Sequence, residues 1–408
     1  MKIDPEQFLN DGFVILKNVI PPDRLDELRA SFEVLVDRQQ AIWADDPEDP
    51  RSHAYKVKQP RLAFQTVVDA ATANTVEFCL HDHTLGVSRQ ALRGAEAAPI
   101  AMFLMCNPAT DYGPDLWHRD IQPKNQAPLA GLQADLVANG PGYVQWNIPL
   151  YDDDVLWVVP GSHRRLNTAQ ENRELLNDRR APLSSGMPVK LEAGDGVMYI
   201  NTILHWPSNY STKLRRVIHL GYRSFGGGLY PYIRGFYWEP SFVKHLSAEA
   251  RATFKRFTKL AAREIDQIEA YMRAMLDQDQ DGFREALARL HPGETGRMVC
   301  VVLLSKVAAR IGTLKRPEVA GLPGPERAQA VGEVSWGSFR IFEDLAGRFT
   351  SAEAELLGQR IAPLNAKLHA QTEQFVPGFQ SGPTPHAFED MPAGFGVDEF
   401  IASWGEAG

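Results

Sequence analysis

The feature that most constrains this chain is its central segment, residues 99 to 225, where short apolar runs alternate with turn-forming residues. The runs are rich in β-branched and aromatic residues and are separated by Pro, Gly, Asn and Asp; they are Ile100–Cys106, Gly142–Pro149, Asp154–Val159, Gly196–Ile203 and Arg216–Arg223. Many short strands with turns between them are typical of an all-β sandwich or barrel, the jelly roll included. The sequence therefore predicts a mainly β core.

Helical patterns flank this core on both sides. Pro22 to about Trp43 carries apolar residues at helical spacing, and beyond residue 240 three further segments do so: Ser247–Asp277, Glu294–Ile311 and Ser351–Gln374. The acidic segment 45–55 and the Gly/Pro-rich Pro317–Pro325 are predicted to be loops or linkers. We therefore expect a β domain with N-terminal helices at residues 1–240, and a helical extension packed on or beside it at residues 241–408.

Composition excludes several classes of protein. With 43 basic and 51 acidic residues the net charge is −8, which argues against a general binder of nucleic acid or anionic membranes. No apolar run approaches the length of a membrane span. Three widely separated cysteines offer neither a disulfide framework nor a CxxC zinc site, so a reducing cytoplasm is the expected location. The expected partner is a small molecule.

Two histidines and an aspartate form the strongest candidate site. His118 and Asp120 are two positions apart in an extended segment, so their side chains point the same way and can reach one metal ion, whereas Arg119 points away. His205 would add the third ligand, and two imidazoles with one carboxylate are the set that ferrous oxygenases use. The alternative for His118 and Asp120 is a hydrogen-bonded pair at a strand end; for His205 it is a loop histidine.

An arginine follows this histidine after a polar break. Arg216 begins an apolar strand, and its planar guanidinium suits the distal carboxylate of a dicarboxylic acid. Alternation puts Arg216 on one face with Ile218, Leu220 and Tyr222, which we expect to be the barrel interior. The adjacent Arg215, with His219, falls on the other face.

Over residues 5 to 225 the chain resembles the phytanoyl-CoA dioxygenase-like (PhyH) family of iron(II)- and 2-oxoglutarate-dependent oxygenases. The resemblance is carried, in order, by Phe8-Leu9-Asn10-Asp11-Gly12-Phe13-Val14, His118-Arg119-Asp120, Val158-Val159-Pro160-Gly161-Ser162-His163, Gly194-Asp195, His205 and Arg216. The stretch Tyr151 to Leu156 departs from the family's usual Asn-Gly turn, and nothing is transferred through it.

This resemblance implies a fold, a set of cofactors and a reaction. The fold is a double-stranded β-helix, that is, a cupin-like jelly roll. The iron ligands are His118, Asp120 and His205, and Arg216 anchors 2-oxoglutarate. Trp146 and Leu104 would line the co-substrate pocket, and Ser208 would help to bind its carboxylate.

The implied reaction is hydroxylation of a small molecule by O2, with release of succinate and CO2 and with ascorbate as a candidate additive. Asp120 favours hydroxylation over halogenation, because related halogenases carry a small residue at that position.

Other interpretations remain open. The same iron centre in this fold also supports desaturation, epimerisation or ring formation. The chain could instead be a non-catalytic binder of metal and 2-oxoglutarate that uses its helical C-terminus for partner contact. A cupin-like enzyme with another metal is disfavoured, because it would not need Arg216. The helical extension is expected to cover the mouth of the barrel or to form a homo-oligomer interface. His163 is expected to be structural, and His81-Asp82-His83 to lie at the surface or to cap a helix.

Overall fold

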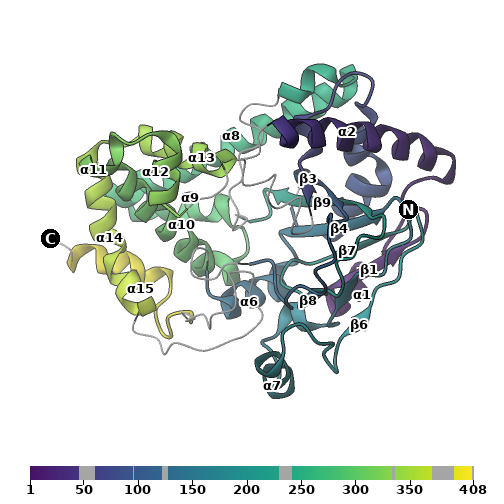
Figure 1. The fold of residues 1–408 in the computed structure, drawn as a ribbon. Helices are drawn as coiled ribbons and strands as arrows, with labels where there is room; N and C mark the ends of the chain where they lie inside the picture. Colours follow the sequence, from purple (N-terminus) through teal and green to yellow (C-terminus); the bar gives the residue numbers. More distant parts are fainter. Residues whose placement is uncertain are drawn as a thin grey trace.

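The computed structural model describes residues 1–45, 60–94, 96–121, 127–228, 241–332, 336–369 and 390–406, and two antiparallel sheets form its centre (Figure 1). The larger sheet has the strand order β1-β7-β4-β9-β3-β2, with β1 Phe13–Leu16, β2 Arg61–Leu62, β3 Glu96–Cys106, β4 Tyr143–Pro149, β7 Gly196–Tyr199 and β9 Arg216–Phe225. The smaller sheet has the order β6-β5-β8, with β5 Leu156–Val158, β6 Met187–Pro188 and β8 His205–Pro207. The predicted β core is thus present as antiparallel sheets with helices around them.

N-terminal helices cover one face of the larger sheet, which we call the helix-covered face. They are α1 Pro5–Asp11, α2 Leu25–Asp45, α4 Asn74–Glu77 and α5 Val87–Ala91. Phe32 of α2 belongs to the same apolar core as Ile218, Leu220 and Tyr222 of β9. Because side chains alternate along a strand, the residues between these three on β9 point to the opposite face.

That opposite face, the inner face, looks toward the smaller sheet. Val197 and Tyr199 of β7 pack there with Leu156 and Val158 of β5 in a separate small core. Gln145 of β4 pairs with Tyr199 in register and therefore shares this face. The inner face is thus enclosed between two layers of strands.

The N-terminal segment contacts two parts of the chain, strand β7 and the segment that follows β5. β1 pairs with β7, so that Phe13 lies opposite Tyr199. Gly12 has φ 82°, and a Cβ at this position would lie 2.2 Å from Nδ1 of His163, so only glycine fits. The buried His163 interacts through Nε2 with the carbonyl of Leu9 at 2.8 Å. His163 is therefore structural, as predicted.

Helices make up the rest of the described chain. They are α6 Leu129–Asn139, α7 Ala169–Asn177, α8 Ala248–Leu276, α9 Gln280–Leu290, α10 Glu294–Lys315, α11 Pro317–Ala320, α12 Gly324–Ala330, α13 Trp336–Gly347, α14 Ser351–His369 and α15 Val397–Ala402. α8 to α15 gather beside the sheets, with α6 between the two parts (Figure 1).

One helix belongs to two cores. The first half of α8 places Phe254 and Phe257 in the core on the helix-covered face of the sheet. Its second half places Ile268 and Met272 in the core of the C-terminal helices. α8 therefore joins the β part to the helical part through continuous apolar packing.

Two buried ion pairs strengthen the same junction. Arg93 donates from both terminal nitrogens to Asp135 of α6, each at 2.8 Å. Arg223 of β9 donates to Glu264 of α8 at 2.8 and 2.6 Å. All four side chains are almost wholly buried, so each pair neutralises charges that could not be left alone.

The helix predictions were largely confirmed, with one exception. Segments 247–277, 294–311 and 351–374 correspond to α8, α10 and α14, although the predicted end of the last lies outside the described residues. Pro317–Pro325 was predicted to be a loop, which is wrong: it contains α11 and the start of α12. Proline within the first turn, followed by an acidic residue, favours both of these short helices.

The predicted acidic loop lies outside the described residues except for Asp45, the last residue of α2. In the part of the chain that is described, helices long and apolar enough to cross a bilayer are absent.

Candidate metal centre

His118, Asp120 and His205 converge on one point. One ligand atom from each of the three side chains lies within 4.8 Å of the other two. Nε2 of His118 is 3.5 Å from Oδ1 of Asp120, and Nε2 of His205 is 3.4 Å from Oδ2. The two imidazole rings have their centroids 4.3 Å apart. This arrangement can hold a single divalent cation.

The backbone fixes both imidazoles. The main chains of His118 and His205 form an isolated antiparallel bridge, with both N–H···O distances at 2.9 Å. Nδ1 of His118 lies 2.7 Å from the carbonyl of Leu116, and Nδ1 of His205 lies 3.0 Å from that of Ile203. A carbonyl accepts only, so each Nδ1 carries the proton and each Nε2 keeps its lone pair for a metal.

Electrostatics hold Asp120 in its charged form. Burial raises the pKa of Asp120, but the neighbouring histidines more than offset this effect, and the pKa lies well below its usual range. Burial lowers the pKa of His118, and the hydrogen bond to Asp120 and its negative charge reverse that effect, so the pKa is raised. The three side chains form a mutually stabilised buried group, which is the environment in which a cation replaces protons.

Arg119 points away from the cluster, as predicted. It is fully buried, and its guanidinium donates to the carbonyls of Ser162 and Thr202 and, at 2.7 Å, to Oδ1 of Asn167. Arg119 therefore ties the ligand segment to neighbouring loops and has a structural role.

A polar row on the inner face supports the carboxylate. Nε2 of Gln145 donates to Oδ2 of Asp120 at 2.8 Å. It lies 3.5 Å from Nε2 of His219, whose Nδ1 is 2.8 Å from Oδ1 of Asn147. Sequence reasoning missed Gln145 and Asn147, and it placed His219 on one face with Arg215 without giving it a role. The alternation of Tyr143, Gln145 and Asn147 with apolar residues was the signal that could have found them.

Arg216 lies on the other side of the sheet. It shares a face with Ile218, Leu220 and Tyr222, as expected, but the expectation that this face is the barrel interior is wrong, because α2 packs on it. Nη2 of Arg216 is 3.0 Å from Oε2 of Glu33 on α2.

Arg215 is the arginine on the inner face, as alternation along β9 places it with His219. Its side chain is 10% exposed and pairs with Asp153, with Nε 2.6 Å from Oδ2. Burial lowers the pKa of Arg215, and the charge of Asp153 reverses this effect and raises it.

Trp146 and Leu104 lie in the core on the helix-covered face. The indole N–H of Trp146 donates to Oγ of Ser88 on α5 at 2.9 Å. Ser208 follows β8, is half-buried, and donates its backbone N–H to Val155 at 2.8 Å. Neither Trp146 nor Leu104 is brought together with the His118 cluster.

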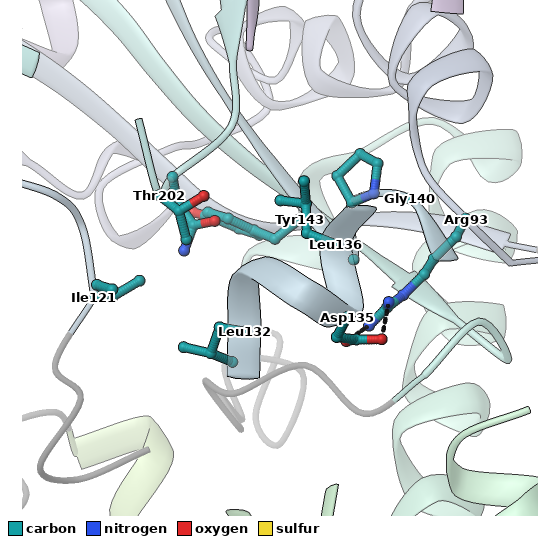
Figure 2. Close-up of a pocket in the computed structure, with 11 residues that line it drawn as sticks. Arg93, Ile121, Leu132, Asp135, Leu136, Gly140, Tyr143 and Thr202 are labelled. Carbon is teal, nitrogen blue, oxygen red and sulfur yellow. Dashed lines mark hydrogen bonds and ion pairs between the residues drawn. The ribbon is translucent and has the colours of Figure 1, made fainter. Parts of the chain in front are cut away.

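A pocket adjoins the cluster on the side of α6 (Figure 2). It encloses about 410 Å³, part of it open to solvent, and its lining residues are Arg93, Ile121, Leu132, Asp135, Leu136, Gly140, Pro141, Gly142, Tyr143, Asn201 and Thr202. Ile121 directly follows Asp120, and Nδ2 of Asn201 donates to the carbonyl of Asp120 at 3.2 Å. Figure 2 shows the Arg93–Asp135 pair at one end of a mostly apolar space.

The second histidine-rich segment, His81-Asp82-His83, has a local structural role. Nδ1 of His81 accepts from the backbone N–H of His83 at 3.1 Å and caps the turn that follows. Asp279 likewise caps α9 by accepting from the N–H of Gly282 at 2.9 Å. Among the described residues, the His118 cluster alone has the composition and spacing of a metal site.

Solved structures that are similar to the chain include EvdMO1, EctD and HygX. EvdMO1 is 19% identical, with 54% of this chain and 49% of that chain covered and a TM-score of 0.37. EctD from S. alaskensis, in its apo form, is 14% identical, with 56% and 78% covered and a TM-score of 0.37. HygX from Streptomyces hygroscopicus, with nickel and 2-oxoglutarate bound, is 17% identical, with 54% and 87% covered and a TM-score of 0.39. The chain thus spans about half the length of EvdMO1.

No curated protein sequence matches the chain. A family model does: that of phytanoyl-CoA dioxygenase (PhyH) matches residues 8–217, more than half of the sequence. The match includes the segment that contacts His163, all three residues of the cluster and Arg215. The chain therefore belongs to the phytanoyl-CoA dioxygenase (PhyH) family of oxidoreductases.

Proposed function

We propose that the chain is a non-haem iron(II), 2-oxoglutarate-dependent dioxygenase that hydroxylates a small organic substrate. The observation that carries this proposal is the cluster of His118, Asp120 and His205, whose ligand atoms lie within 4.8 Å of one another. Each histidine uses Nδ1 for a backbone carbonyl and turns Nε2 toward the Asp120 carboxylate, so the donor set fits a ferrous ion. Three protein ligands would leave positions for a co-substrate and O2.

For the co-substrate we propose Arg215 in place of Arg216. Arg215 lies on the face of the sheet that carries His219 and Gln145, whereas Arg216 pairs with Glu33 of α2 on the other. Nη1 of Arg215 is buried and has no hydrogen-bond acceptor among the described residues. A buried donor of this kind suits the distal carboxylate of 2-oxoglutarate.

When bound, the iron and co-substrate would supply the oxidising power, with one oxygen atom of O2 going to the substrate and one to succinate, and with release of CO2. The chain's own residues hold and orient the reactants. The carbonyls of Leu116 and Ile203 fix the imidazole protons, and Gln145 orients the Asp120 carboxylate. His118 and His205 are buried and the Asp120 side chain is 15% exposed, which limits the access of bulk water.

We further propose that the substrate occupies the pocket beside α6. Ile121, Leu132 and Leu136 supply apolar walls next to the cluster. Ile121 and Leu132 also belong to the core of the C-terminal helices, which ties the pocket wall to residues 241–408. In this proposal the helical region shapes the mouth of an oxygenase domain at residues 1–240.

The strand order supports a double-stranded β-helix. In chain order, the β segments lie largely in alternate sheets. β3, β4, β7 and β9 belong to the larger sheet. Between them in the chain come the His118 segment, which bridges β8, and the strands of the smaller sheet, β5, β6 and β8. Every pairing among them is antiparallel. This is the winding expected of a jelly roll.

The decisive measurement is O2 uptake and succinate formation by the purified chain with Fe²⁺, 2-oxoglutarate and ascorbate, before any substrate is known. Uncoupled turnover should require both Fe²⁺ and 2-oxoglutarate and should disappear in a His118→Ala variant that no longer retains iron. Binding of both ligands without any uncoupled turnover, alone or with a substrate panel, would instead favour a non-catalytic binding protein. Product mass separates hydroxylation from desaturation or ring formation.

A matched pair of variants tests the assignment of the arginine. Arg215→Met should raise the KM for 2-oxoglutarate by about tenfold or more, because the contact of the guanidinium with the distal carboxylate is lost. Arg216→Met should destabilise the fold through Glu33 and leave that KM nearly unchanged. The reverse ranking would restore Arg216 as the anchor.

A further inference from the structure

Arg215 already has an anionic partner within the chain. Its Nε lies 2.6 Å and its Nη2 3.4 Å from the two carboxylate oxygens of Asp153. The side chains are 10% and 6% exposed, so the pair is shielded from water. Asp153 cannot easily move aside, because its backbone bridges Leu191 through hydrogen bonds of 3.0 and 2.9 Å.

The contact uses only one edge of the guanidinium. Asp153 takes the edge formed by Nε and Nη2, and the edge formed by Nη1 and the second Nη2 proton is left. Nη1 is buried without an acceptor among the described residues. A buried N–H that lacks an acceptor is costly, and so the open edge points to a ligand oxygen.

Charge distinguishes this arginine from its neighbour. Glu33, the partner of Arg216, has a side chain that is 36% exposed and can be solvated by water. Arg215 and Asp153 form a buried pair with no net charge. A second carboxylate on the open edge would leave one uncompensated negative charge in a poorly hydrated place.

We propose that Asp153 is the permanent counter-ion of Arg215 and limits the affinity for 2-oxoglutarate. The distal carboxylate of 2-oxoglutarate has to share the Arg215 guanidinium with Asp153. This inference rests on the proposed function. Asp153 is an affinity-determining residue: it keeps Arg215 charged and aligned before binding and repels the incoming dicarboxylate. The distal carboxylate therefore contributes less to binding than an unshared guanidinium would allow.

Binding to the zinc-loaded protein tests this without turnover. The dissociation constants of 2-oxoglutarate and of 2-oxopentanoate, which has the same chain length but no distal carboxylate, are measured by titration calorimetry. Asp153→Asn keeps the shape and an acceptor oxygen and removes the charge. It should tighten 2-oxoglutarate binding by about tenfold, the size of a modest charge–charge term, and leave 2-oxopentanoate unchanged. Asp154→Asn, at the exposed neighbouring position, is the matched control and should change neither constant.

Several outcomes would overturn the inference. Unchanged or weaker 2-oxoglutarate binding in Asp153→Asn would do so, and so would equal tightening for both acids. The wild type gives a test that needs no variant: 2-oxoglutarate should bind less than about 100-fold more tightly than 2-oxopentanoate, and a much larger ratio contradicts charge sharing. If the zinc-loaded wild type binds neither acid, the proposed function itself fails, which is distinct from a wild type that binds both while the variant shows no change.

Discussion

At the scale of single residues, the cluster depends on groups that do not themselves reach the metal position. Gln145 donates to the Asp120 carboxylate, and backbone carbonyls hold the protons of both histidines. Such contacts fix the direction of each donor atom, so that the three side chains converge on one point. Two of these supports are backbone carbonyls. The third is the Gln145 amide, which a side-chain substitution can remove.

Replacement of Gln145 by Leu is therefore expected to weaken metal binding. The substitution keeps the volume and removes the amide donor, so Asp120 loses its fixed orientation, and the affinity for Zn²⁺ should fall by about 10- to 100-fold. Competition with a chromophoric chelator measures this. Gln133→Leu is the matched control, because Gln133 is also buried but donates to the carbonyl of Arg165. Equal zinc affinity in wild type and Gln145→Leu would contradict a role for this amide.

The members of the His118 cluster could be predicted from the sequence, and the groups that support them could not. His118 and Asp120 are two positions apart in an extended segment, and imidazole with carboxylate is a recognisable metal-binding pair. Gln145 and Asn147 are amides with no characteristic spacing, and their importance depends on which strands become neighbours. A pairing such as that of Asn147 with His219 is a property of the sheet and is not encoded locally.

At the scale of elements, β9 explains why the sequence could not show which of the two arginines lies on the inner face. All of its residues are buried, because α2 and its neighbours cover one face and the smaller sheet encloses the other. Alternation correctly groups Arg216 with Ile218 and separates Arg215 from them. Apolar content cannot tell which of two buried faces points inward, and only the position of α2 decides it.

β9 also anchors the helical part through Arg223 and Glu264 of α8. Arg223→Met should lower the free energy of unfolding by about 3–5 kcal/mol, because Glu264 is left as a buried charge without its partner. The double variant Arg223→Met with Glu264→Leu should recover most of that loss. Urea unfolding measures both.

The exposed pair Arg284–Asp398 provides the comparison, with side chains 43% and 79% exposed. Arg284→Met should cost no more than about 1 kcal/mol. If the Arg223 single and double variants were equally destabilised, packing of Arg223 rather than its charge would be responsible.

At the scale of the whole molecule, α8 contributes to the cores of both the β part and the helical part. We therefore expect the two parts to unfold as one unit. Fluorescence reports mainly on the β part and its helices, which hold five of the eight tryptophans: Trp43, Trp117, Trp146, Trp157 and Trp206. Circular dichroism at 222 nm reports mainly on the C-terminal helices. The two signals should give the same urea midpoint, and added Zn²⁺ should raise both equally.

Phe257→Ala gives the matching perturbation, because Phe257 packs α8 against the sheet core. It should lower both midpoints together, at a cost of about 3–5 kcal/mol. Two separated transitions, with zinc shifting only the fluorescence signal, would mean that the helical part is an independent unit.

The pairing of β1 with β7 has a consequence for how the protein is made. Phe13 leaves the ribosome long before its partner Tyr199, which emerges only after most of the β region has been synthesised. At ~5–20 residues per second, the N-terminal strand waits roughly 10 to 40 s for its neighbour. His205 is translated just after Tyr199, so the partner of β1 and the last residue of the His118 cluster emerge almost together. A nascent chain stalled before this point should not yet retain a metal ion.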